Sequence, residues 1–99
     1  MLENSNLAVF SPLLHSQFSV RPTPDLVVAL ELVQAADRGS NPRQEQFALL
    51  FRGPLDPFLP QHLYAVEHDE LGQFALFLVP VARDEQGYSY EAVFNRLRQ

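Results

Sequence analysis

The feature that most constrains the fold is the run from Gln46 to Tyr64, an apolar stretch followed by a proline-rich turn and the start of another apolar stretch. Residues 47–51, Phe-Ala-Leu-Leu-Phe, are apolar on both faces of an extended chain, which is typical of a strand covered on both sides. The three prolines of the turn each lack a backbone donor, so they interrupt any regular ladder. We therefore predict a central strand that ends abruptly in a turn.

Four further segments alternate apolar and polar residues with the period of two that is typical of strands. They are residues 17–21, 63–68, 73–81 and 88–94. Polar stretches separate them and are predicted to be turns, including a tight turn at 69–72 and a hairpin loop at 83–87. We expect Pro22 and Pro24 to end the first of these strands.

Residues 25–38 fit two structures. Asp25 after a proline resembles a helix start, Gly39 resembles a helix stop, and apolar residues recur on one helical face. Against a helix, Leu26 to Leu32 alternates as a strand does, and several residues are β-branched. The residues alone favour neither structure.

A short helical turn is predicted before the first strand. Ser11 is expected to cap it, with Pro12 at its first position. Phe10, Leu13 and Leu14 would then plug one end of the core. Together with five strands, or six if 25–38 is extended, this predicts a mainly β domain, a small antiparallel barrel or sandwich.

The length of 99 residues allows one hydrophobic core, so we predict a single β domain over 1–99, with residues 1–8 and 96–99 frayed. The chain has no Lys and no Cys, which excludes Schiff-base and P-loop lysines, thiol nucleophiles and disulfides. Its seven arginines are scattered, so no nucleic-acid partner is predicted. The sequence predicts neither a membrane span nor a signal peptide, and we expect a cytoplasmic protein.

Several segments resemble a family of small single-domain bacterial proteins known only as a domain of unknown function. They include Phe77-Leu-Val-Pro-Val81, and the most specific are Leu50-Phe-Arg-Gly-Pro54 and Tyr90-Glu-Ala-Val-Phe-Asn95. The resemblance implies an extended conformation for 25–38 and no established activity. It also implies a structural or partner-binding role, in a bacterial or phage-tail-like assembly. Ser16 departs from the family pattern, in which a glycine is expected in the turn before Phe18.

Polar residues within the apolar strands are candidates for a structural role. Arg52 and Glu91 interrupt such strands, and a buried charge is costly unless it is paired. If Arg52 lies inside, we expect it to bind a carboxylate or the carbonyls of the turn over 53–60, and in the structural interpretation it pins this turn. The alternative is that its fork of donors anchors an anionic ligand or a partner. Asn95 is expected to satisfy backbone groups at the end of the last strand.

The surplus of aromatic and aliphatic residues favours a function based on binding. We expect Leu55, Phe58 and Leu59 to be partly exposed in the turn and to form an interaction patch. The main hypothesis is a non-enzymatic domain that binds a protein partner or a second copy of itself, through this turn or an uncovered sheet edge.

Two other functions are weighed against this hypothesis. A barrel that binds a small molecule or an anion would place Arg52, Tyr64 and His68 at its mouth and would need a cavity of roughly 300 Å³. A hydrolase could draw a triad from Ser89, His68 and Asp56, but no nucleophile-elbow motif is present. The three histidines lack metal-binding spacing, so neither a metal nor a cofactor is predicted, and His68 is expected to cap the turn before Gly72, with its ring against the sheet edge.

Overall fold

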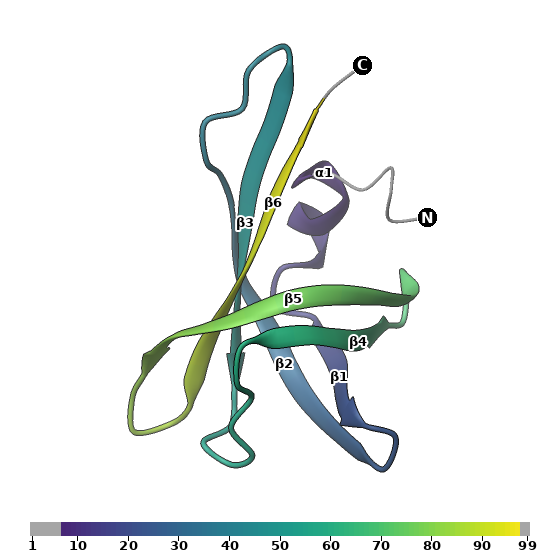
Figure 1. The fold of residues 1–99 in the computed structure, drawn as a ribbon, viewed down its shortest axis with the longest axis vertical. Helices are drawn as coiled ribbons and strands as arrows, with labels where there is room; N and C mark the ends of the chain where they lie inside the picture. Colours follow the sequence, from purple (N-terminus) through teal and green to yellow (C-terminus); the bar gives the residue numbers. More distant parts are fainter. Residues whose placement is uncertain (1–6, 98–99) are drawn as a thin grey trace.

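The alternating segments form six strands, preceded by a short helical segment, in the computed structural model, which describes residues 7–97 (Figure 1). The elements are α1 Leu7–Phe10, the 3-10 turn η2 Ser11–Leu13, β1 Gln17–Thr23, β2 Leu26–Asp37, β3 Gln44–Gly53, β4 His62–His68, β5 Gly72–Arg83 and β6 Tyr88–Leu97. Within the described range no helix is long and apolar enough to cross a membrane.

The strands close into a barrel in the order β1-β2-β3-β6-β5-β4, with β4 paired to β1 and every pair antiparallel. The predicted mainly β fold is confirmed, and of the two architectures the barrel is the one observed. Among the described connections, only the one from β3 to β4 joins strands that are not neighbours in the barrel. This connection, residues 54–61, is named the crossover loop below (Figure 1).

The undecided segment 25–38 is strand β2, as the resemblance implied. Val28, Leu30 and Leu32 are buried at every second position and face the core. The first half of β2 pairs with β1 and the second half with β3, with a register shift between Leu32 and Gln34. Both neighbours require an extended chain here, so tertiary pairing decides what local propensity left open.

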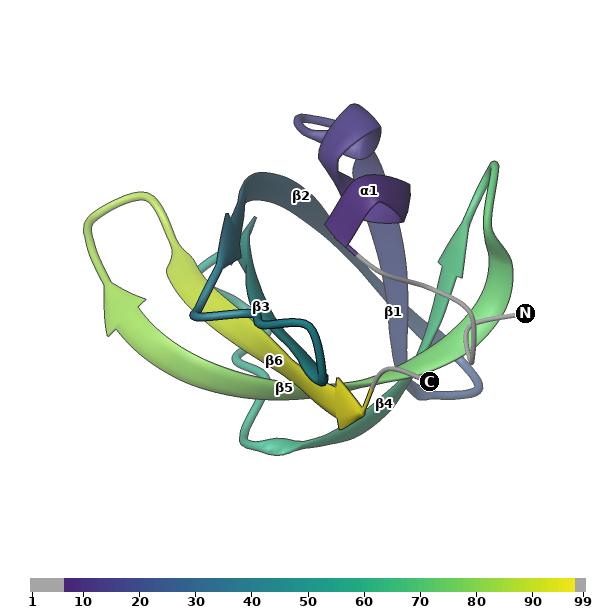
Figure 2. The same cartoon turned by 90° about the horizontal axis from the view of Figure 1, so that it is seen from above.

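Strand β5 changes partner along its length. Residues 72–78 pair with β4, whereas residues 79–83 pair with β6. Beyond this point β6 continues along β3 to Leu97 and diverges from β5 (Figures 1 and 2). Segment α1 lies beside the diverging ends of β3 and β6, where Phe10 packs on Phe94 with ring centroids 5.5 Å apart.

Three local predictions at the N-terminal side are corrected. Ser11 does not cap the helical turn, because its hydroxyl donates to the Leu7 carbonyl at 3.0 Å and Phe10 occupies the cap position. Leu14 is 40% exposed, so only Phe10 and Leu13 serve as plugs. Strand β1 continues through Pro22, since a register shift lets the proline lie within the pair.

The predicted frayed ends fall partly outside the described residues. Residues 7 and 8 belong to α1, and residues 96 and 97 belong to β6. Residues 1–6 and 98–99 lie outside the part of the chain that the structure describes.

Candidate functional site

The crossover loop is held over one end of the barrel by two tyrosines. Leu59 is only 1% exposed, and its N–H donates to the Tyr90 hydroxyl at 3.0 Å. The Tyr64 hydroxyl donates to the Pro60 carbonyl. The prediction that Leu59 lies in an exposed patch is wrong, because its side chain belongs to the barrel core. The loop is therefore anchored to β4 and β6 by both packing and hydrogen bonds.

Burial further favours the neutral form of both anchoring hydroxyls. Desolvation raises the pKa of Tyr64, and the nearby Tyr90 raises it further. Desolvation also raises the pKa of Tyr90, although the N–H of Leu59 partly opposes this shift. A neutral phenol can donate as Tyr64 does and accept as Tyr90 does, so these hydrogen bonds persist at neutral pH.

The anchored loop displays two large apolar side chains. Phe58 is 45% exposed and Leu55 is 38% exposed. The Phe58 ring packs against the Tyr88 ring, with ring centroids 4.8 Å apart and ring planes inclined by 54°. We name Leu55 and Phe58 the loop patch. Two of the three residues predicted for this patch are thus exposed.

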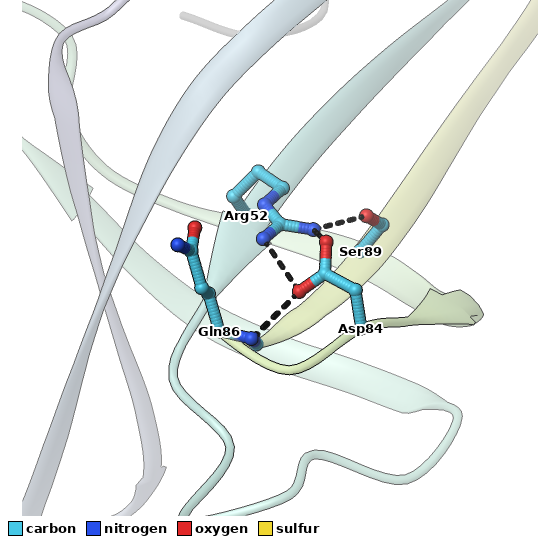
Figure 3. Close-up of polar contacts among 5 residues, drawn as sticks. Arg52, Asp84, Gln86 and Ser89 are labelled. Carbon is cyan, nitrogen blue, oxygen red and sulfur yellow. Dashed lines mark hydrogen bonds and ion pairs between the residues drawn. The ribbon is translucent and has the colours of Figure 1, made fainter.

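Arg52 lies outside the core and binds the loop between β5 and β6 (Figure 3). Its Nη1 and Nη2 contact the two Asp84 carboxylate oxygens at 2.9 and 3.0 Å, and Nη1 also donates to Ser89 Oγ at 3.3 Å. A carboxylate is thus one partner of Arg52, but its contacts hold this hairpin, and the expectation that Arg52 pins the turn over 53–60 is wrong. Asp84 also accepts the backbone N–H groups of Gln86 and Gly87, so Arg52 pins a tight, well-satisfied loop.

This pairing shifts both ionisation equilibria towards the charged forms. The hydrogen bond from Arg52 lowers the pKa of Asp84 to about 2, with a further contribution from the Gln86 N–H. The same bond raises the pKa of Arg52. The two-point contact uses the guanidinium fork, so an external anion would have to displace Asp84.

Gly87 of the pinned hairpin lies against the backbone of Gly53 and Pro54, where β3 ends and the crossover loop begins. A Cβ atom added to Gly87 would lie 2.0 Å from the Gly53 carbonyl oxygen. Only glycine allows this approach, because any side chain would push the two segments apart. The Arg52 contacts and the crossover loop therefore belong to the same end of the barrel.

A groove of about 430 Å³ lies on the outer surface beside Arg52. Gln17, Glu31 and Arg52 line it as a row of paired positions across β1, β2 and β3. His15, at φ 69°, places its Nδ1 2.9 Å from the Glu31 carboxylate at the same groove. The groove is thus polar and carries charges of both signs.

His68 caps its turn, as predicted, and also has a partner that the sequence did not indicate. Its Nδ1 accepts a hydrogen bond from the N–H of Glu70 at 3.0 Å. Its ring packs on the Phe18 ring, with the ring centroids 4.4 Å apart. Its Nε2 lies 2.9 Å from Ser16 Oγ. The ring is buried against the core rather than placed at a sheet edge.

The hydrogen-bond directions decide what the Ser16–His68 pair can do. Because Nδ1 accepts a backbone N–H, a neutral ring carries its proton on Nε2 and donates it to Ser16. Ser16 in turn donates to the Leu13 carbonyl at 2.6 Å. In this arrangement His68 is a donor to the serine and not a base that activates it.

The residues expected at a barrel mouth each have separate partners. Arg52 binds Asp84, Tyr64 binds Pro60 and His68 binds Ser16. Within residues 7–97, no two of these three predicted residues share a hydrogen bond. Ser89, the serine of the triad considered from the sequence, accepts a hydrogen bond from Arg52. Among residues 7–97, no group of three His, Cys, Asp or Glu side chains could hold a metal ion.

The two remaining structural candidates, Glu91 and Asn95, each bind another side chain. Glu91 pairs with Arg38 at 3.1 Å, which satisfies the charge that interrupts β6. Asn95 accepts a hydrogen bond from the Gln44 side-chain amide on β3. The expectation that Asn95 satisfies backbone groups is replaced by this cross-strand side-chain pair, which follows from the pairing of β3 with β6.

Comparison with known proteins gives one family. Residues 5–94 match the family described as Domain of unknown function (DUF6916). No curated protein and no solved structure matches the chain.

Proposed function

The chain belongs to this family of unknown function, and from that premise we propose that it is a non-catalytic domain that binds another protein. It would serve as a structural or interaction component of a larger assembly, for which a bacterial or phage-tail-like particle is a fitting setting. The binding surface in this proposal is the loop patch.

The observation that supports the proposal is an apolar surface on a rigid loop. Leu55 and Phe58 are exposed, whereas the neighbouring Leu59 is fixed in the core and hydrogen-bonded to Tyr90. A loop that is already ordered loses little conformational entropy when a partner binds. Exposed aromatic side chains are also enriched at the centres of protein interfaces.

The groove beside Arg52 supports a second candidate, the binding of a small polar ligand. Its volume of about 430 Å³ is within the range of known ligand sites, which begins at roughly 300 Å³. However, the Arg52 fork is already occupied by Asp84, so the groove offers an anion no free bidentate donor. The loop patch is therefore the stronger candidate.

Affinity capture from a lysate of the source cells tests the proposal. The tagged wild-type chain is compared with Phe58→Asp and with Leu14→Asp, in which an apolar residue of similar exposure outside the strands is replaced. We expect Phe58→Asp to lose the captured protein and Leu14→Asp to retain it. Equal capture by all three chains, or equal loss in both variants, would count against the loop patch as the binding surface.

A further inference from the structure

We infer that a second copy of this chain docks on the outer face of β4 and β5, to form a two-fold symmetric dimer. This face is built from one pair of large side chains and one pair of small ones. Leu63 and Phe77, a cross-strand pair, are 58% and 48% exposed. The next outward pair, Ala65 and Ala75, is also exposed. The large pair thus forms a ridge beside the flat strip formed by the two alanines. We name these four residues the β4–β5 face.

Two opposite charges flank this face. Arg21 on β1 pairs in register with Ala65, and Glu67 lies two residues further along β4. Both side chains are exposed, and within residues 7–97 neither makes an ion pair or a side-chain hydrogen bond. A hollow of about 150 Å³ lies over Ala65 and is lined by Arg21 and Glu67.

The register makes this arrangement complementary to a copy of itself. The two-fold axis would lie in the plane of the interface, along the diagonal from Ala65 to Phe77. Rotation about it places Arg21 of each copy opposite Glu67 of the other copy, and Leu63 opposite Ala75. Alternate residues of a strand are ~6.8 Å apart and neighbouring strands ~4.8 Å apart, so on an ideal sheet each exchanged pair superposes to within about 3 Å.

The exchange has favourable chemistry at every position. Each Arg21 meets the partner's Glu67 in the hollow over Ala65, so two opposite-charge pairs form. Each Leu63 covers the partner's Ala75, and the two Phe77 rings meet on the axis. The strands of the two copies would cross at a steep angle, one of the two common modes of sheet packing. An interface in which one patch serves both subunits is the usual form of a closed dimer.

This inference does not depend on the proposed function, because the loop patch takes no part in it. Sedimentation equilibrium of the full chain over a concentration series tests it. We expect a reversible dimer for the wild type and for Phe58→Asp, and at least about tenfold weaker association for Phe77→Asp, since an aspartate on the axis would face its own copy.

Charge reversal supplies a test that does not change the apolar residues. Arg21→Glu and Glu67→Arg should each weaken the dimer, because each creates two like-charge contacts. The double variant Arg21→Glu/Glu67→Arg should restore association towards the wild-type value. A wild-type chain that stays monomeric at its highest soluble concentration overturns the inference. So does a dimer that resists Phe77→Asp, or a double variant that fails to recover.

Discussion

At the scale of single residues, Arg52 and Glu91, which interrupt apolar strands, are each held by a specific partner that is distant in the sequence. A carboxylate was one of two partners expected for Arg52 if it lay inside; Arg52 lies outside the core and nevertheless binds a carboxylate. The sequence did not indicate Asp84, since that residue lies 32 positions further along and reaches Arg52 only through the pairing of β3 with β6. Ser16 was missed as a partner of His68 for the same reason, because 52 positions separate the two.

The Arg52–Asp84 pair predicts a pH-dependent stability. Because the folded-state pKa of Asp84 is lowered from 3.8 to about 2, the ionised carboxylate favours the folded chain. This contribution is present above the ordinary pKa and is lost as the pH falls from about 4 towards 2. Asp84→Asn should therefore lower the melting temperature at pH 7, and its difference from the wild type should shrink below pH 4.

Thermal unfolding followed by circular dichroism from pH 2 to pH 7 measures this difference. Glu85→Gln, which removes a carboxylate from the same exposed loop, is the matched control and should follow the wild-type curve. An Asp84→Asn curve parallel to the wild type over the whole range would show that the pair contributes nothing to stability.

At the scale of elements, alternation predicted the strands well, and the turn signals predicted where they end. The crossover loop was only partly predictable. Its prolines indicated that the ladder stops, but nothing local distinguished Leu59 from Leu55 and Phe58. Burial of Leu59 depends on Tyr90, which lies 31 residues away and offers its hydroxyl to the loop. Which residue of an apolar turn faces inward is thus decided by tertiary contacts.

The two tyrosines that anchor the crossover loop predict unequal effects of removing their hydroxyls. Tyr90→Phe leaves the N–H of buried Leu59 without its acceptor, which should cost about 1–3 kcal/mol of unfolding free energy. Tyr64→Phe leaves the carbonyl of Pro60 without its donor. Because Pro60 is exposed, water can replace the hydroxyl, so a smaller loss of unfolding free energy is expected. Urea titration of both variants gives the comparison. Equal losses, or a larger loss for Tyr64→Phe, would contradict the assigned anchoring role of Tyr90.

At the scale of the whole molecule, closure of the barrel was beyond sequence reasoning. A small barrel and a sandwich share the same strand pattern, and the choice is made by the pairing of β1 with β4, which brings together segments about 45 residues apart. Closure also gives every strand one face towards the core and one face towards solvent. The inward positions take most large apolar side chains, and those left outside are spread over the crossover loop, β2, β4, β5 and β6, with Leu14 before β1.

The loop patch is proposed to contact another protein, and photo-cross-linking at a single residue detects such a contact. A photoreactive amino acid is placed at position 58 in the full chain, and at position 14 as a control, where Leu14 is similarly exposed on another part of the barrel. In the source cells, we predict that position 58 yields a discrete adduct with a different protein and that position 14 does not. An account based on the loop patch would be contradicted if position 58 gave no adduct beyond those formed at position 14.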